Sequence, residues 1–337
     1  MVIGAGAIGG ALGARLHQAG CEVVLVARGE HLRVLQDTGL RLRAPTEDVR
    51  LRVPAVAAPD EVSLTARDVL VLATKTQQAG EALRTWADVP VHGPDDEVLG
   101  TAGERLPLLT ALNGVASERM ALRYFRSVVG VCVWMPAVHL VPGEVILRAA
   151  PRSGVLHLGS VPVGAVPDPV LREVAADLDA AGFDAPLPPD VMPWKYRKLI
   201  SNLGNVFQAL VAGNGDWRGL EQLAVAEARR VLDAAEIAVT PDEEEAAVRA
   251  AGFSMHPVPG VPDDVGGSTW QSLRRGTGNV ETDYLNGEIA RVAHGIGQTA
   301  PLNATLASLA RRAAQTGHAP GSLSADQLAA QLGVDPQ

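Results

Sequence analysis

Lysine, cysteine and aromatic residues are scarce in this chain of 337 residues. The two cysteines, Cys21 and Cys132, are too few for a disulfide framework. Both lie in apolar, strand-like runs, so we expect free thiols in a reduced, cytoplasmic protein. No cysteine cluster or histidine pair has the spacing of metal ligands, so we expect no metal site.

Only three of the 29 basic residues are lysines, Lys75, Lys195 and Lys198, and the others are arginines. Arginine cannot release a proton at neutral pH, whereas a lysine can when its pKa is lowered. The three lysines are therefore the first residues to consider for acid–base chemistry. The alternative is that they are ordinary surface residues.

Long runs of one kind are also missing. No apolar run reaches the ~18 residues of a membrane span, and the net charge of −9 comes without an extended charged block. The acidic run at residues 242–245 fits the exposed start of a helix. These features predict no nucleic-acid partner and no membrane partner. The chain length suggests two domains, and we expect no signal peptide because the N-terminus already belongs to the fold.

A glycine-rich stretch near the N-terminus has the pattern G-x-G-x-x-G, formed by Gly4, Gly6 and Gly9. A strand is expected over residues 1–3, a helix over 11–19 and a second strand over 21–26, which is the context of a dinucleotide-binding βαβ unit. We expect the backbone of Gly4, Gly6, Ala7, Ile8 and Gly9 to hold a pyrophosphate at the helix N-terminus. The alternative is a glycine-rich turn before a packing helix. Only three residues precede Gly4, so either the first strand is short, which would weaken cofactor affinity, or the true start of the chain lies upstream.

The end of the second strand bears on the choice of cofactor. An NAD site usually has an acidic residue about 20 residues after the glycines, whereas an NADP site often has an arginine there. Arg28 occupies this place, so we expect NADP(H). Glu30 is the weaker candidate for an NAD-type contact. His31 fits either the phosphate pocket or an ordinary surface position.

Two further strands end in polar residues. An apolar run at residues 68–73 predicts a strand buried on both faces, and Lys75 follows it. A strand over 106–112 is followed by Asn113 and Gly114. Ligands of open α/β sheets lie beyond the carboxyl ends of the strands, where these side chains are expected. Other predicted strands cover 39–43, 49–53, 128–134, 145–147 and 155–158, and residues 92–105 are expected to be a surface loop.

The second half of the chain is predicted to be helical. Helices are expected over residues 194–202, 220–237, 270–273, 281–295 and 302–315. The predicted domains are a Rossmann-type domain at 1–190, a helical domain at 191–316 and a loosely ordered tail at 317–337. The apolar helices after Leu220 fit a homodimer interface or the domain's own core, and both interpretations stay open.

Six short motifs follow one another along the chain: Gly4-x-Gly6-x-x-Gly9, Lys75-Thr76-Gln77-Gln78, Leu112-Asn113-Gly114, Arg197-Lys198-Leu199-x-x-Asn202, Ser268-x-Trp270-Gln271 and Glu281-x-Asp283-Tyr284-x-Asn286-Gly287. Taken together, they resemble the ketopantoate reductase (2-dehydropantoate 2-reductase) family. The resemblance runs from the first residues to about Asn303.

The resemblance implies a fold and a reaction. The fold would be α/β, a Rossmann-type domain followed by an all-helical domain like that of 6-phosphogluconate dehydrogenase. The reaction would be reduction of a 2-oxo acid by NADPH, most directly 2-dehydropantoate to pantoate. Lys198 would be the general acid, and Glu281 would order it and approach the cofactor.

The remaining implied roles concern binding. Asn113, Asn202 and Ser268 would contact the substrate, and Asn113 and Lys75 would contact the cofactor. Each residue also has a plainer interpretation. Lys198 could form a surface salt bridge, Glu281 could be a helix N-terminal acid, and Ser268 could be an N-cap. Trp194, Trp270 and Tyr284 are expected to be core residues.

Two departures bear on the substrate. Val265 stands where pantoate-forming members would have an asparagine, and the segment from Trp270 to Glu281 is one residue longer than usual. Loss of a hydrogen bond to substrate changes discrimination strongly. A related NADP-dependent enzyme for another 2-oxo, hydroxy or amino acid is therefore the alternative. A non-catalytic NADP-binding regulator is disfavoured because Lys198 and Glu281 are both present.

Overall fold

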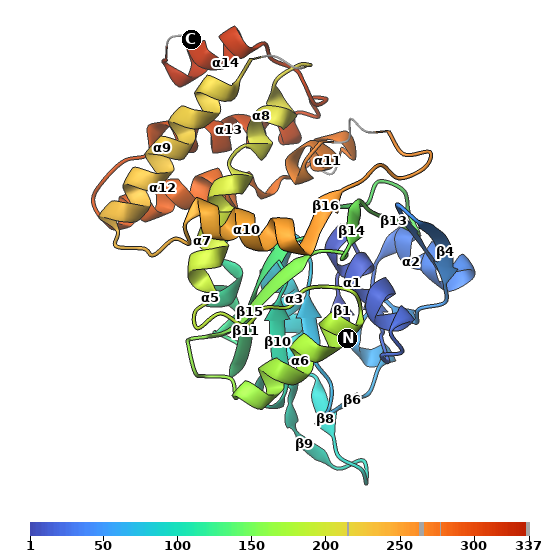
Figure 1. Ribbon diagram of the computed structural model, residues 1–337. Coiled ribbons are helices and arrows are strands. Elements are labelled where there is room, and N and C mark those ends of the chain that lie inside the picture. Colours follow the sequence, from blue (N-terminus) through green and yellow to red (C-terminus); the bar gives the residue numbers. More distant parts are fainter. Residues whose placement is uncertain (214–215, 263–265, 277, 335–337) are drawn as a thin grey trace. The chain divides into compact units, whose positions relative to one another are not determined.

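The computed structural model describes residues 1–213, 216–262, 266–276 and 278–334, which form two compact units (Figure 1). The first unit comprises Met1–Lys195 and Pro241–Val261, and the second comprises Tyr196–Thr240 and Pro262–Gln337. The division falls inside helix α7 (Met192–Asn202), a few residues after the boundary expected at 190. The return of Pro241–Val261 to the first unit was not expected. Its strand β16 (Phe253–Met255) pairs with β14 (Ala149–Pro151) of that unit.

A seven-stranded sheet organises the first unit, with strand order β15-β11-β10-β7-β1-β2-β5. All neighbours are parallel except β15, which runs antiparallel to β11. The short strand β1 lies inside the sheet between β2 and β7, where Val2 pairs with Leu25 on one side and Val71 on the other. The strands are β1 (Val2–Ile3), β2 (Leu25–Val26), β5 (Ala55–Val56), β7 (Leu70–Leu72), β10 (Pro107–Thr110), β11 (Ser127–Trp134) and β15 (Val155–Val161).

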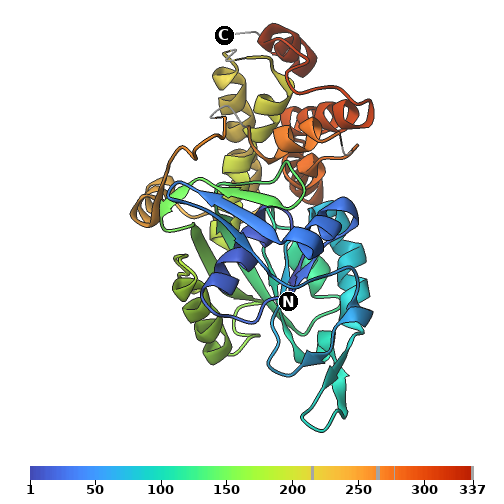
Figure 2. The same ribbon diagram turned by 90° about the vertical axis from the view of Figure 1, so that its right-hand side faces the viewer.

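Helices cover both faces of this sheet (Figure 2). Alternate strand residues face opposite sides, so Val71 packs with α1 and α6 while Leu70 and Leu72 pack with α3. This confirms a strand buried on both faces. The helical segments of the first unit are α1 (Ala7–Gln18), α2 (Gly29–Thr38), η1 (Pro59–Glu61), α3 (Thr76–Ala87), α4 (Ala102–Arg105), α5 (Ser117–Ala121), α6 (Asp168–Ala180) and α10 (Asp242–Gly252).

Smaller sheets flank the main one. The strands predicted over residues 39–43 and 49–53 correspond to β3 (Leu40–Ala44) and β4 (Glu47–Leu51), which form an antiparallel hairpin. This hairpin joins β13 (Glu144–Leu147) and β12 (Ala137–Val138). The prediction of a loop over residues 92–105 was wrong. This segment contains β9 (Val98–Thr101) and α4, which is held by the capping box of Thr101 and Glu104. Strand β9 pairs with β8 (Pro90–His92), which pairs with β6 (Leu64–Thr65).

The second unit is helical, as predicted. Its core contains Phe207, Leu220, Leu306 and Leu328. Beyond the end of α7 its helices are α8 (Asn205–Leu210), α9 (Arg218–Ala234), α11 (Ser268–Arg274), η2 (Glu281–Tyr284), α12 (Asn286–Gly295), α13 (Pro301–Gln315) and α14 (Ala325–Leu332).

The segment after residue 317 contains the short helix α14. Ser324 caps α14, since its hydroxyl accepts a hydrogen bond from the Gln327 amide at 3.1 Å. Leu328 and Ala329 of the same helix are buried in the core. An apolar face and a capping box therefore order this segment at least as far as Leu332.

None of the described helices combines the length and the apolar character needed to cross a membrane. Within the same residues, no group of three or more His, Cys, Asp or Glu side chains is arranged to hold a metal ion. Both cysteines are free thiols. Cys132 is buried, whereas Cys21 is partly exposed because it lies before β2 and not inside it.

Candidate functional site

The glycine loop joins β1 to α1 in a tight turn. Gly4 has φ +102°, a conformation that side chains rarely adopt. The amides of Gly4 and Ala5 both donate to Val26 O, which ties the loop to the end of β2. A Cβ atom added to Gly9 would lie 2.0 Å from Gly4 O, whereas one added to Gly6 would meet nothing within 4 Å. Gly9 thus serves close packing, and the space beside Gly6 is open.

The start of α1 is suited to an anion. Gly6 is the N-cap and carries no side chain, and the first turn of the helix contains no acidic residue. The first amides of a helix lack partners within the helix and carry partial positive charge. The amides of Ala7 and Ile8 belong to this turn, so the predicted phosphate cradle has the right local chemistry.

His31 supports this loop from α2. Its Nδ1 accepts a hydrogen bond from the Gly143 amide at 2.8 Å, and its Nε2 lies 2.8 Å from Ala5 O. An imidazole that accepts at Nδ1 is neutral and donates from Nε2. Burial lowers the pKa of His31, which favours the same state. His31 thus lies at the start of α2, is half-buried and contacts the glycine loop, and its place in the phosphate pocket stays a prediction.

Arg28 lies at the position that distinguishes NADP from NAD sites, directly before α2. Its side chain is 70% exposed and forms an ion pair with Glu81 of α3 at 3.5 Å. An exposed pair of this kind contributes little free energy. Glu30 is also exposed and lies 3.7 Å from Arg33. Arg28 can therefore exchange its present partner for a phosphate at small cost.

Lys75 and Asn113 follow neighbouring strands of the sheet. Lys75 is the N-cap of α3, after β7, and Asn113 comes three residues after β10. Both side chains are half-buried. A Cβ atom added to Gly4 would lie 2.9 Å from Thr74 N, so the glycine loop is next to the segment that bears Lys75. The glycine loop, Arg28, Lys75 and Asn113 thus all follow carboxyl ends of strands in the first unit, whereas Glu281, which is also predicted to approach the cofactor, belongs to the second unit.

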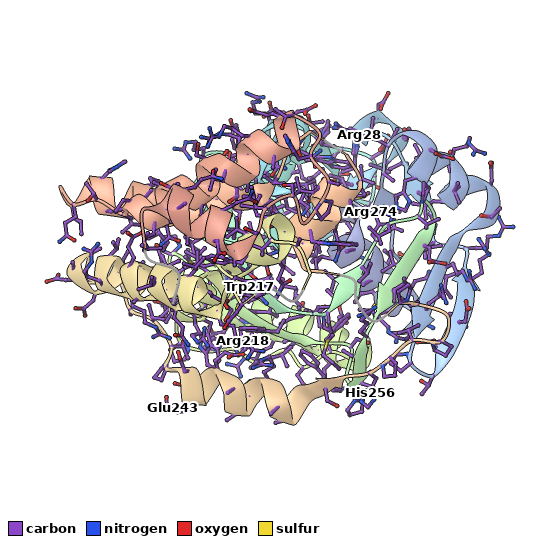
Figure 3. The ribbon with its side chains drawn as sticks, turned by 90° about the horizontal axis from the view of Figure 1, so that it is seen from above. Arg28, Trp217, Arg218, Glu243, His256 and Arg274 are labelled. Carbon is purple, nitrogen blue, oxygen red and sulfur yellow. The ribbon has the colours of Figure 1, made fainter. Side chains whose placement is uncertain are left out.

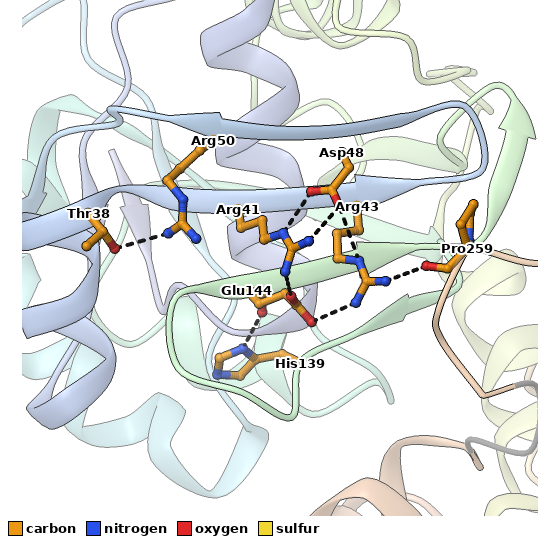
Figure 4. Close-up of polar contacts among 8 residues, drawn as sticks. All are labelled: Thr38, Arg41, Arg43, Asp48, Arg50, His139, Glu144 and Pro259. Carbon is orange, nitrogen blue, oxygen red and sulfur yellow. Dashed lines mark hydrogen bonds and ion pairs between the residues drawn. The ribbon is translucent and has the colours of Figure 1, made fainter.

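The arginine-rich β3–β4 hairpin is a network of ion pairs (Figure 4). Arg41 pairs with Asp48 and Glu144, and Arg43 pairs with Glu144 at 3.5 Å. The Arg41 guanidinium lowers the pKa of Asp48, and Asp48 in turn raises the pKa of Arg41. Arg41 and Arg43 therefore already have carboxylate partners.

The second unit contains the predicted catalytic residues. Lys198 and Asn202 lie on α7 four residues apart, so they share a face of the helix. Asn202 is buried and Lys198 is half-buried. The side-chain amide of Asn205 donates a hydrogen bond from Nδ2 to Ser268 Oγ at 3.5 Å. The alternative that Ser268 is an N-cap is wrong, because Gly267 holds that position and Ser268 begins the helix.

Glu281 begins η2 and is only 4% exposed. The negative charge of Glu281 acts on the guanidinium of Arg275. Burial lowers the pKa of Arg275, and the negative charge of Glu281 acts in the opposite direction. Sequence reasoning missed Arg275. The signal available was its place in the lengthened segment between Trp270 and Glu281. Val265, the other position that bears on specificity, lies outside the described residues.

The aromatic residues divide between two environments. Trp194 is buried in the core of the first unit, as predicted. Trp270 packs against the core of the second unit but is partly exposed, and Tyr284 is also partly exposed.

The described residues also form a surface hollow of about 470 Å³ along α9. Trp217 and Arg218 mark its position at the start of that helix (Figure 3), and no predicted site residue lines it.

The first unit is thus a Rossmann-type dinucleotide-binding fold, followed in the chain by a helical unit that carries a lysine, a buried glutamate and a serine. Two family models match these parts. The model "Ketopantoate reductase PanE/ApbA" matches residues 1–162, and "Ketopantoate reductase PanE/ApbA C terminal" matches residues 190–314. The chain belongs to the ketopantoate reductase PanE/ApbA family of oxidoreductases.

Individual relatives agree over nearly the whole chain. The 2-dehydropantoate 2-reductase of Pyrococcus horikoshii is 24% identical over 92% of this chain and 95% of its own length. That of Mesorhizobium japonicum is 27% identical over 94% and 98%. A PanE/ApbA family ketopantoate reductase from Ralstonia eutropha has a solved structure with TM-score 0.73 and 26% identity, covering 94% of this chain and 99% of that one.

One of the similar solved structures is named for a different enzyme activity. D-mandelate dehydrogenase, solved with NADH and anilino(oxo)acetate, has TM-score 0.73 and 23% identity, covering 94% of this chain and 99% of its own. This likeness shows the same fold.

Proposed function

We propose that this protein reduces a 2-oxo acid to a 2-hydroxy acid with NADPH, and that 2-dehydropantoate, reduced to pantoate, is its leading substrate. The observation that carries the proposal is the match of both family models, one over each predicted domain. The curated relatives described above are 2-dehydropantoate 2-reductases, which supports the substrate.

The residues of the first unit fit a dinucleotide. The open space beside Gly6 and the uncapped start of α1 suit a pyrophosphate, and no acidic side chain of that turn opposes it. Exposed Arg28 suits the 2′-phosphate that distinguishes NADP from NAD. Lys75 and Asn113 would hold the nicotinamide end, near the carboxyl ends of β7 and β10. When bound, NADPH supplies the hydride.

The chain's own residues supply the proton and the orientation. The Lys198 ammonium would donate a hydrogen bond to the carbonyl oxygen of the substrate and transfer its proton as alkoxide character develops there. General acid catalysis of this kind contributes about 10²–10⁴-fold to the rate. The buried Glu281 carboxylate would orient the ammonium, and Asn202 on the same helix face would fix the substrate.

Ser268 is proposed to bind the substrate carboxylate together with Asn202. The cation Arg275, held near Glu281, adds positive charge to this part of the unit. The alternative substrate remains a different 2-oxo, hydroxy or amino acid, since Val265 lacks the amide expected for a pantoate hydroxyl. We also propose a cytoplasmic enzyme without nucleic-acid or membrane partners. Sedimentation of the purified protein tests the homodimer hypothesis.

The test is NADPH oxidation by the purified protein with a panel of 2-oxo acids. The panel includes 2-dehydropantoate and 2-oxo-2-phenylacetate, the oxidised form of mandelate. We expect the highest kcat/KM with 2-dehydropantoate. A higher value with an aromatic 2-oxo acid would favour the alternative substrate, and failure with every 2-oxo acid would contradict the proposed reaction.

A further inference from the structure

One of the three lysines has no part in the proposed chemistry, yet it is the most deeply buried. Lys195 and its partner Glu118 have side chains only 1% exposed, and Lys195 Nζ lies 2.6 Å from Glu118 Oε1. Nζ also donates to Leu112 O and Val131 O, both at 3.2 Å. An ammonium has three donors, so each of its hydrogens has an acceptor.

The carboxylate is held through the same oxygen. Glu118 Oε1 also accepts hydrogen bonds from Thr110 Oγ1 at 2.6 Å and Ser117 Oγ at 3.2 Å, whereas the buried Oε2 has no hydrogen-bond partner among the described residues. Thr110 is the last residue of β10, and Glu118 lies on α5. The pair therefore joins the end of β10, the start of α5, the middle of β11 and the first turns of α7, all within the first unit.

The carbonyl that Lys195 holds is the one directly before Asn113. Ala111 N still donates to Leu72 O in the sheet, and the chain then leaves the strand. Gly114 has φ +78°, so the backbone turns there. The only residue between the fixed Leu112 carbonyl and this turn is Asn113. Its side-chain direction therefore depends on the orientation of the Leu112 peptide.

A buried ion pair is a poor source of stability, because desolvation offsets most of the attraction and apolar replacements of similar volume are often neutral or stabilising. The pair therefore calls for another explanation. We propose that Lys195 is a positioning residue, whose ammonium, paired with Glu118, fixes the turn at residues 112–114 so that Asn113 meets cofactor and substrate. The inference rests on the proposed function for the role of Asn113.

The decisive variant replaces both partners, Lys195→Met with Glu118→Leu, so that neither charge is left buried alone. We expect thermal melting close to that of the wild type, while kcat falls about tenfold to a hundredfold, the range that a misplacement of about 1 Å causes. The pair Glu245→Leu with Arg249→Met is the matched control. It also has a buried carboxylate, but its ion pair joins two residues of helix α10. The Arg249 guanidinium also lies 5.2 Å from the centre of the Trp134 ring at the end of β11, a contact away from residues 112–114, and we expect kcat of the control to stay at the wild-type value.

A mutant cycle that includes Asn113→Ala distinguishes a positioning role of Lys195 from general destabilisation of the protein. In an Asn113→Ala background the double replacement should lower kcat by less than twofold further, because the side chain to be positioned is gone. Fully additive losses, or a wild-type kcat in the double variant, would overturn the proposal. If the double variant does not fold, the same cycle uses Glu118→Gln, which keeps the volume and one acceptor oxygen, and a wild-type kcat there would equally overturn it.

Amide hydrogen exchange tests the fixed turn without any catalysed reaction, so its result does not depend on the proposed function. Hydrogen exchange at the Ala111 amide, which donates to Leu72 O directly before the turn, should be at least tenfold faster in the double variant than in the control pair. If the wild type reduces no 2-oxo acid but exchange changes in this way, the proposed reaction fails and the fixed turn stands. Unchanged exchange would refute the fixed turn itself.

Discussion

The glycine loop must pack closely at Gly9 and must leave space for a pyrophosphate beside Gly6. Substitution by alanine at each position in turn tests these two requirements separately. In Gly9→Ala the new Cβ would lie 2.0 Å from Gly4 O and 3.0 Å from both Ala73 Cβ and Val2 Cγ1. The nearest atom belongs to the backbone, so relief requires a shift of well over an ångström in the turn between β1 and α1. In Gly6→Ala the Cβ would enter open space, and φ at this position is −72°, which alanine adopts freely.

The energies follow from these contacts. Overpacking costs about 1–3 kcal/mol, and a clash with fixed backbone places Gly9→Ala at the upper end, less up to about 1 kcal/mol gained in helix propensity. A loss of about 2 kcal/mol lowers Tm by roughly 4–8 °C for a unit of this size. Gly6→Ala should change stability by less than about 1 kcal/mol. It should nevertheless weaken NADPH binding at least about tenfold, since its methyl group occupies the space proposed for the pyrophosphate.

The assay pairs thermal melting with NADPH binding by fluorescence for the wild type and both variants. The reasoning predicts that Gly9→Ala loses Tm and that Gly6→Ala keeps Tm and loses affinity. Wild-type affinity in Gly6→Ala would show that the pyrophosphate does not lie against this residue. Equal losses of Tm in both variants would show that the turn is not packed as described.

The remaining predictions concern cofactor preference and pH. Arg28→Ala should reduce the preference for NADPH over NADH by at least about tenfold. Glu81→Gln removes the competing carboxylate 3.5 Å away and should strengthen NADPH binding. An unchanged preference in the first variant, or weaker NADPH binding in the second, would refute this role of Arg28. Burial lowers the pKa of His157 from 6.5 to about 4, so between these values the unfolded chain binds the proton and the folded chain does not. Stability is therefore complete above pH 6.5 and decreases by about 3 kcal/mol as pH falls to 4. His157→Phe should remove most of this pH dependence in urea unfolding, whereas His256→Phe, at an exposed position, should leave it unchanged; equal pH dependence in the wild type and His157→Phe would contradict the assignment.

The sequence predicts those parts of the fold that local pattern determines. The run at residues 68–73 is apolar on both faces, and the structure buries it on both faces. The strands of the β3–β4 hairpin are predicted because apolar and polar residues alternate in Leu40-Arg41-Leu42-Arg43 and Val49-Arg50-Leu51-Arg52. Residues 92–105 were misjudged because short edge strands such as β9 bury few side chains and so leave no apolar pattern. The return of Pro241–Val261 to the first unit depends on the pairing of β16 with β14, a contact between residues about a hundred positions apart, which no local pattern encodes.

The candidate site shows the same limit. The glycine spacing identified the loop, and the lysine count singled out Lys195 before any role could be assigned to it. Its burial with Glu118 could not be predicted, because the partner lies 77 positions away and depends on the packing of α7 against β10 and β11. Arg275 was missed for a similar reason, since its relation to Glu281 is set by the turn after α11.

The central claim is that Lys198 is the general acid of an NADPH-dependent 2-oxo acid reductase. The most direct measurement is kcat for NADPH oxidation with the best 2-oxo acid, compared between the wild type and Lys198→Ala at matched Tm and matched NADPH affinity. We predict a loss of kcat of at least about 10²-fold. A Lys198→Ala enzyme that binds NADPH normally and turns over at the wild-type rate would contradict the claim.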